Sequence, residues 1–228
     1  MLDVLQDPGL RFALALTIKT CAWSAALFLL CAPPLAWLLA RKRGLWVRAL
    51  GFLTTLPLVF PPIALGYLLL LVLGRTGPVG SVFADMGISL VFTPTAVSLA
   101  AFIAGLPLVV KPLQSALESR TLQEIEFAAR VHGARPATIF LRVTLPLIRP
   151  SLLSGLLLGL TRSSGEVGIT MMLGGNISDR TNTLSLEIFN AVSRADFDAA
   201  TALCLVLSIF TFAVFCLLEF VEKRSYKL

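Results

Sequence analysis

The sequence predicts an all-helical integral membrane protein with about five transmembrane helices. Of its 228 residues, 57% are hydrophobic and 14% are charged, and its mean hydropathy is +0.87. Soluble domains contain nearer to about 45–50% apolar and about 25% charged residues. Apolar runs long enough to cross a bilayer, roughly 20 residues, occur at 20–40, 49–73, 88–110, 147–173 and 199–218. We therefore expect residues 1–228 to form one transmembrane domain.

Helices are expected because a backbone in contact with lipid must satisfy its hydrogen bonds within its own segment. The apolar runs do not show the alternation of β-barrel strands. The N-terminus carries Asp3 and Asp7 but no cluster of basic residues, so we do not expect a cleaved signal peptide.

The distribution of charge predicts how the chain is oriented in the membrane. With five spans, residues 41–48, 111–146 and the C-terminal tail lie on one side. With Arg149, this side has thirteen Lys/Arg and five Asp/Glu, whereas the other side has five and seven. Positive charge marks the cytoplasmic side, so we expect the N-terminus outside and the C-terminus inside. The net charge of +6 then reflects the orientation of the chain in the membrane. The sequence has no patch of basic and aromatic residues of the kind that would indicate nucleic acid binding.

Residues 111–146 form the one long segment predicted on the cytoplasmic side. Thr121 and Glu124 have the spacing of a capping box that opens a short helix, and Gly133 is placed to cap its C-terminus. Pro136 suits the first position of a second helix, and Pro146 is expected to end it. The prediction is a helix–glycine–helix elbow, with small residues at the bend: Ala128, Ala129, Gly133 and Ala134.

Two interpretations of this elbow are open. It could be an amphipathic linker resting on lipid headgroups, or a helix that docks a partner protein. Small residues at a bend allow close approach of another protein and favour docking.

The elbow also resembles a known family. FAARVHGA, followed by VTLP with Gly133 thirteen residues before Pro146, resembles the EAA loop of ABC-importer permeases. That loop is the coupling helix that sits in a groove of the cytoplasmic ATPase. The family's glutamate position, six residues before the glycine, is Phe127 here, and Glu126 lies one residue earlier. The resemblance assigns ATPase coupling to Glu126, Phe127, Ala128, Ala129, Gly133, Ala134, Leu145 and Pro146.

One branch of that family is similar over nearly the whole chain. LPLVFPPIALGYLLL (56–70), TRSSGEVGITMMLGGNI (161–177) and TNTLSLEIFNAV (181–192) resemble the molybdate importer permease. The sequence resembles tungstate permeases almost as closely, and it resembles sulfate permeases more distantly. The resemblance implies a homodimer with two ATPase subunits and an external oxyanion-binding protein, working by alternating access in the cytoplasmic membrane of a prokaryote.

No motif predicts chemistry in this chain. The phosphate loop G-x-x-x-x-G-K-[ST] is absent, so ATP hydrolysis is expected in a separate subunit. The single histidine, His132, and the four isolated cysteines show no metal-ligand spacing. Ser163-Ser164-Gly165 is not a nucleophile elbow. We therefore expect no cofactor and no enzymatic activity.

Two groups of residues in the apolar runs are candidates for the translocation pathway. The first is Pro57, Pro61, Pro62 and Gly66 in 49–73, where proline is expected to kink the helix, either for packing or to line the pathway. The second is Arg162, Ser164 and Glu166 in 147–173. A separate face of small residues, at positions 151, 155, 159 and 163, is expected to pack against another helix.

Arg162 and Glu166 are four residues apart, so they can pair on one helix face. Unpaired charges are costly within a bilayer and face a protein interior or water. Three interpretations remain: a structural ion pair, a pair that faces the translocation cavity, or an irregular segment beyond the end of the span.

Other classes of function are less consistent with the sequence. An ion-coupled secondary transporter could use an intramembrane Arg–Glu pair, but internal repeats are expected there and none is seen. A membrane scaffold without transport would leave the proline-rich second span unexplained.

Overall fold

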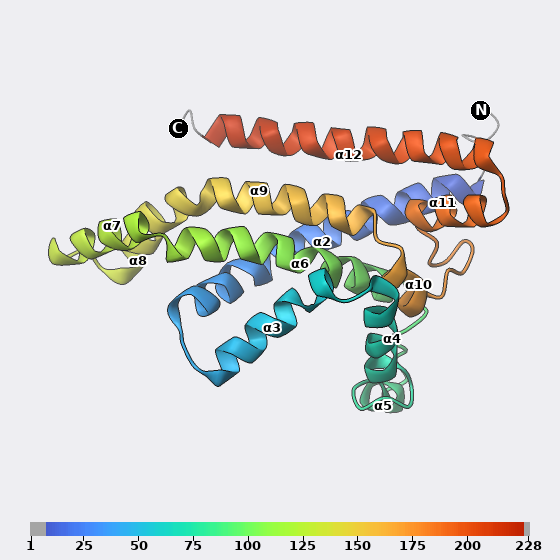
Figure 1. Ribbon diagram of the computed structural model, residues 1–228, viewed down its shortest axis with the longest axis horizontal. Coiled ribbons are helices and arrows are strands. Elements are labelled where there is room, and N and C mark those ends of the chain that lie inside the picture. The colour runs from blue at the N-terminus through green and yellow to red at the C-terminus, as the bar shows by residue number, and fades with distance from the viewer. Residues whose placement is uncertain (1–7, 226–228) are drawn as a thin grey trace.

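The computed structural model describes residues 8–225, with side chains through residue 221, and this part of the chain is helical without strands. Four long helices run side by side along the molecule (Figure 1): α2 (Pro8–Arg41), α6 (Pro94–Glu118), α9 (Leu145–Ser164) and α12 (Phe197–Ser225). Within the described residues, four helical stretches are long and apolar enough to cross a membrane: Pro8–Arg41, Pro94–Glu118, Pro136–Ser164 and Phe197–Val221. The fold is therefore that of an all-helical, multi-pass membrane protein.

The first helix begins earlier than predicted. We expected a span at 20–40, but the described part of the chain is already helical at Pro8, in α2. Its N-terminal part packs on α11 (Leu184–Ser193), because Leu10 and Leu184 share a buried cluster. Thr17 Oγ1 also accepts a hydrogen bond from the Leu184 N–H at 3.0 Å. Contacts with a segment distant in sequence thus extend this helix.

The second apolar run is two helices rather than one. Residues 49–73, predicted as one kinked span, form α3 (Leu45–Val59) and α4 (Pro62–Leu73) with a break at Phe60 and Pro61. A residue before a proline is pushed out of the helical conformation, and both break residues precede one. Pro57, by contrast, lies inside α3. Figure 1 shows α4 turning steeply away from the direction of the long helices, with the short α5 (Gly80–Asp85) at its far end.

The third helix is shifted toward the C-terminus relative to the predicted 88–110. Thr93 caps α6 by accepting from the Ala96 N–H at 3.2 Å, and Pro94 takes the first position. The helix continues to Glu118. The first part of the predicted loop 111–146 is therefore helical.

The fourth apolar run is also divided. Residues 147–173 comprise most of α9 and of α10 (Gly168–Gly174), separated by a turn at 165–167. The predicted small-residue face of α9 packs against α6, as expected. A Cβ atom added at Gly159 would lie 2.5 Å from Val109 Cγ2, and Ser163 Oγ donates to the Ala101 carbonyl at 2.7 Å.

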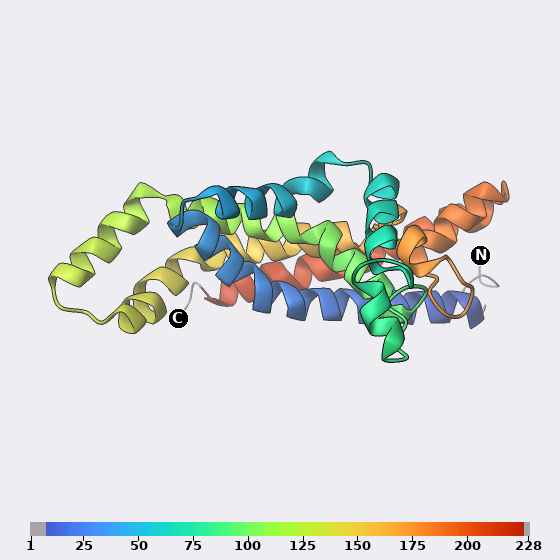
Figure 2. The ribbon, with the colours of Figure 1, turned by 90° about the horizontal axis from the view of Figure 1, so that it is seen from below.

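The two ends of the bundle carry different elements. One end carries the α2–α3 turn, the segment with α7 (Arg120–Val131), α8 (Pro136–Ile139) and the π-helix η1 (Phe140–Thr144), and the end of α12. The opposite end carries the start of α2, α10 and α11 (Figures 1 and 2). The helix α12, predicted at 199–218, lies alongside α9, and only 6% of its most apolar stretch is buried within the protomer. Most of α12 is therefore exposed on the surface of the single chain.

Candidate functional site

The predicted elbow is present, but it begins differently from the prediction. Ser119 is the one residue between α6 and α7, and its side chain accepts from the Leu122 N–H at 3.4 Å. Thr121 is already inside α7. The prediction of a Thr121–Glu124 capping box was therefore wrong, because α6 extends to Glu118 and Ser119 takes the capping position of α7.

Gly133 ends α7 as predicted. It has φ +79°, a conformation that glycine adopts without strain. The Gly133 N–H donates to the Arg130 carbonyl at 2.9 Å, and the Ala134 N–H donates to the Ala129 carbonyl at 3.0 Å. This pair of bonds is the Schellman motif. Pro136 then takes the first position of α8, also as predicted.

Pro146 does not end the second helix of the elbow. The chain stays helical from Pro136 to Ser164, and Pro146 lies near the start of α9. Just before it, residues 140–144 form a π-helical turn in which the Leu145 N–H donates to the Phe140 carbonyl. A proline supplies no N–H, and such a widened turn absorbs the missing bond. The prediction of a helix end was therefore wrong.

Glu126 joins the elbow to the rest of the protein. Its side chain is 6% exposed. Arg41, the last residue of α2, donates to Glu126 Oε2 at 2.6 Å. Thr144 in η1 donates to Oε1, also at 2.6 Å. Arg130 lies 3.7 Å away as a second, weaker partner. One carboxylate thus connects α2, α7 and η1.

Sequence reasoning did not identify Arg41 and Thr144 as its partners. Arg41 is 85 residues from Glu126, and no local pattern connects them. The one available signal was an acidic residue at a position of α7 that shares its face with Leu122, which is also buried.

The opposite face of α7 is exposed and mixed, because the Arg120–Glu124 ion pair lies on it beside apolar residues. Phe127 is 67% exposed and Val131 is 69% exposed. Ala128 and Gly133 are exposed too, while Ala129 and Ala134 are half-buried. At the base of the elbow Leu145 is half-buried and Pro146 exposed. Of the residues predicted to couple to an ATPase, Glu126 alone points into the protein.

Arg162 and Glu166 form an ion pair. Arg162 lies in the last turn of α9, and Glu166 lies in the turn before α10. Glu166 Oε1 accepts from the Ile169 N–H at 2.7 Å, so the carboxylate also caps the start of α10. The Glu166 side chain is 1% exposed and that of Arg162 is 30% exposed. The structure thus contains the ion pair, whereas an irregular position beyond the helix holds for Glu166 but not for Arg162, which lies inside α9.

Ser164 and the glycines near α10 serve packing within the protomer. Ser164 Oγ donates to the Thr161 carbonyl at 2.9 Å, and its own carbonyl accepts from Ser185 Oγ at 2.6 Å. A Cβ atom at Gly66 would lie 2.8 Å from Met172 Cβ, and one at Gly168 would lie 2.7 Å from Pro62 Cβ. These glycines allow α4 and α10 to touch.

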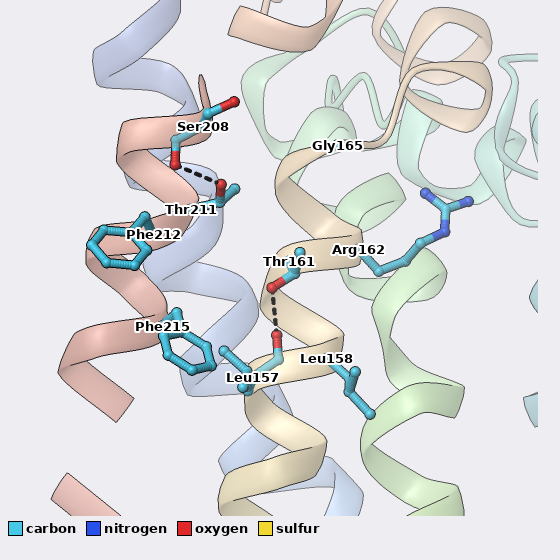
Figure 3. Close-up of a pocket in the computed structure, with 9 residues that line it drawn as sticks. All are labelled: Leu157, Leu158, Thr161, Arg162, Gly165, Ser208, Thr211, Phe212 and Phe215. Carbon is cyan, nitrogen blue, oxygen red and sulfur yellow. Dashed lines mark hydrogen bonds between the residues drawn. The ribbon is translucent and has the colours of Figure 1, made fainter. Parts of the chain in front are cut away.

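An open groove of about 750 Å³ lies between α9 and α12 (Figure 3). Its hydroxyl groups bond to their own helices: Thr161 donates to the Leu157 carbonyl, Thr211 to the Leu207 carbonyl and Ser208 to the Cys204 carbonyl. Figure 3 shows the Arg162 side chain extending away from Phe212 and Phe215. Arg162 is thus the charged residue at the edge of a groove whose other lining residues are apolar, glycine or locally bonded hydroxyl residues.

Comparison with known proteins agrees with this architecture. Residues 32–226 match the family model described as "Binding-protein-dependent transport system inner membrane component". The chain belongs to this family. The permease chains of two solved ABC transporters share the fold. One is a bacterial alginate transporter in complex with an alginate pentasaccharide-bound periplasmic protein (TM-score 0.78, 18% identity, covering 98% of this chain and 81% of that one). The other is the methionine transporter MetNI in an inward-facing conformation (TM-score 0.66, 18% identity, 95% and 94%).

Relatives of this chain include proteins named for molybdenum transport and for sulfate transport. The "Molybdenum transport system permease protein ModB" of Mycobacterium tuberculosis is 42% identical over 207 residues, which cover 90% of this chain and 77% of that protein. Its counterpart in Azotobacter vinelandii is 35% identical over 216 residues, 94% of each chain. The "Sulfate transport system permease protein CysW" of Synechocystis is 34% identical over 231 residues, 98% of this chain and 81% of that one.

Proposed function

We propose that this chain is the permease subunit of an ATP-driven ABC importer that carries molybdate into the cytoplasm. The observation that carries the proposal is the 42% identity to a molybdenum permease over 90% of the chain, together with a fold shared with ABC transporter permeases. Sulfate is the second candidate, since a sulfate permease is 34% identical over 98% of the chain. Tungstate shares the charge and tetrahedral shape of molybdate and is a third.

The elbow is the proposed docking site for a cytoplasmic ATPase. Phe127 and Val131 offer exposed apolar area, and Ala128 and Gly133 leave room for close approach. Glu126 holds α7 against α2 and η1. A push on α7 would therefore reach the membrane helices through a rigid connection, as alternating access requires.

The proposed topology has the elbow in the cytoplasm and the N-terminus outside. The bundle supports this assignment because the elbow, the α2–α3 turn and the end of α12 share one end, where most Lys and Arg residues gather. The broken pair α3–α4 would be the second of five spans. Two copies of the chain, two ATPase subunits and an external binding protein complete the proposed importer in the cytoplasmic membrane of a prokaryote.

Arg162 is the proposed anion-facing residue of the pathway, and the exposed prolines Pro61 and Pro62 at the break are proposed to line it as well. Both Glu166 oxygens are engaged and the Ser164 hydroxyl donates to its own helix. Arg162 keeps part of its surface open. Its pairing with Glu166 reduces the net charge offered to a dianion, so passage would be favoured over trapping.

The test is uptake into proteoliposomes that contain the chain together with its ABC ATPase and an external oxyanion-binding protein. We expect molybdate uptake that requires ATP on the side of the membrane where the ATPase is bound. Vanadate should block this uptake, and a protonophore should not. Tungstate should compete, and sulfate should compete weakly. Uptake that a protonophore abolishes and ATP does not drive would indicate a secondary transporter.

A second experiment tests the elbow. Ala128→Trp places a bulky side chain on its exposed face, and we expect loss of ATPase co-purification. Val192→Trp changes a 50% exposed position at the opposite end of the bundle and serves as the matched control. Equal ATPase recovery with both variants would remove the elbow from the interface.

A further inference from the structure

A polar groove of about 420 Å³ lies where the end of α2, the start of α3 and the last turns of α6 meet. Its lining includes four basic residues, Lys42, Arg43, Arg48 and Lys111, and one acidic residue, Glu118. The α2–α3 turn, which supplies part of this lining, lies at the same end of the bundle as the elbow (Figures 1 and 2). It is separate from the residues assigned to the pathway.

The positive charge of this groove is largely uncompensated. Among the described side chains, Lys42, Arg43 and Arg48 have no carboxylate within ion-pair distance. Lys111 Nζ donates to Gln114 Oε1 at 3.3 Å, and Gln114 Nε2 donates to Glu118 Oε1 at 2.9 Å. Four like charges around one hollow repel each other, so an anion bound among them would relieve this repulsion.

The surface beside the groove indicates what kind of anion fits. Leu45 and Trp46, which follow directly after Lys42, Arg43 and Gly44, are 81% and 88% exposed. Tryptophan is enriched where a membrane protein crosses the headgroup layer, and basic pockets on the cytoplasmic side suit acidic headgroups. A free phosphate would meet the charges, but it would leave Leu45 and Trp46 without an apolar partner. A lipid satisfies both.

We propose that this groove binds the phosphate headgroup of an anionic phospholipid, with Leu45 and Trp46 against its glycerol and upper acyl chains. Lys42 and Arg43 from the α2–α3 turn, Arg48 from α3 and Lys111 from α6 supply the charge. The neighbouring residue Arg41 holds Glu126 of the elbow. A bound lipid therefore steadies the turn on which the elbow is anchored. This site depends on the membrane location of the chain and not on its transported substrate.

The first measurement is native mass spectrometry of the purified full chain released from mixed phosphatidylglycerol–phosphatidylcholine nanodiscs. The variant Lys42→Gln/Arg43→Gln/Arg48→Gln removes three charges from the groove. The control Arg75→Gln/Arg180→Gln/Arg194→Gln removes three exposed charges from other loops. Since each basic residue near an anionic surface contributes about 1 kcal/mol, retained phosphatidylglycerol should fall by at least about tenfold in the groove variant. The control should retain the wild-type amount. Equal retention in wild type and groove variant would overturn the proposal.

The second measurement uses Trp46 as a local probe and separates a lipid from a free anion. In a Trp23→Phe/Trp37→Phe background, Trp46 is the remaining tryptophan. Phosphatidylglycerol brominated near the headgroup should quench its fluorescence more strongly than the phosphatidylcholine analogue. Inorganic phosphate at millimolar concentration should not reverse this. Equal quenching by the two lipids would show that the groove does not select an anionic headgroup, and reversal by phosphate would show that it takes a soluble oxyanion; either result would overturn the proposal.

Discussion

Two buried carboxylates, one near each end of the bundle, differ in how far along the sequence their partners lie. Glu166 pairs with Arg162 four residues before it and accepts from the Ile169 N–H three residues after it. Glu126 takes its strongest partners from 85 residues before it and 18 residues after it. Glu166 therefore holds one turn in shape, whereas Glu126 holds three separate elements together.

The difference suggests a division of work between the two ends. A local pair can keep its geometry while the surrounding helices move, because both partners move together. A pair between distant elements transmits motion from one to the other. The proposed ATPase-docking end has the second kind, and the proposed anion-facing turn has the first.

The largest effect is expected for Glu126→Ala. It leaves Arg41 without its main partner, and breaking a buried pair costs about 3–5 kcal/mol. Because the Arg41 side chain is 21% exposed, we expect the low end, about 3 kcal/mol. Thermal unfolding in detergent measures the loss, and ATPase stimulation by the binding protein measures coupling.

Its control is Glu124→Gln on the same helix. The Glu124 side chain is 72% exposed and lies 3.8 Å from Arg120, so the change should be below about 0.5 kcal/mol. If both variants lose the same stability, the contrast between buried and exposed carboxylates on α7 is wrong.

Glu166→Ala should cost less, about 2 kcal/mol, since it removes a cap and a pair to a partly hydrated arginine. Glu166→Gln keeps an acceptor for the Ile169 N–H, so it should recover part of this loss. Melting temperatures of the two variants make the comparison. An equal loss in both would mean that the ion pair, and not the cap, holds the turn.

Thr144→Val removes one hydrogen bond to Glu126 with little change in shape. We expect about 1.5 kcal/mol. In a double-mutant cycle with Glu126→Gln, the two losses should not add. Additive losses would place Thr144 outside the network.

The smallest effect is expected for Gly133→Ala, about 1 kcal/mol, because the residue would keep φ +79°. Gly133→Asn should cost less, since asparagine tolerates this conformation. Chemical denaturation of the purified protein resolves the two. An alanine variant as stable as wild type would contradict the role of Gly133 in ending α7.

The elements that depend on neighbouring residues were predictable. Gly133 and Pro136 carry their backbone preferences wherever they stand, and the Arg162–Glu166 pair follows from helical spacing. The double proline at 61–62 marked the break in the second run, although the sequence suggested a kink and the chain leaves the helix. Pro146 misled because a π-helical turn could absorb its missing hydrogen bond.

The sequence by itself determined the membrane class, the helical content, the bend of the elbow and the resemblance to ABC-importer permeases. All of these follow from composition, period and local spacing. Only the tertiary structure decided that Glu126 faces Arg41 and Thr144, that α2 extends back to Pro8, and that Gly66 and Gly168 let α4 touch α10. These contacts join residues far apart along the chain. Their free energy comes from burial and pairing that exist only once the helices have packed.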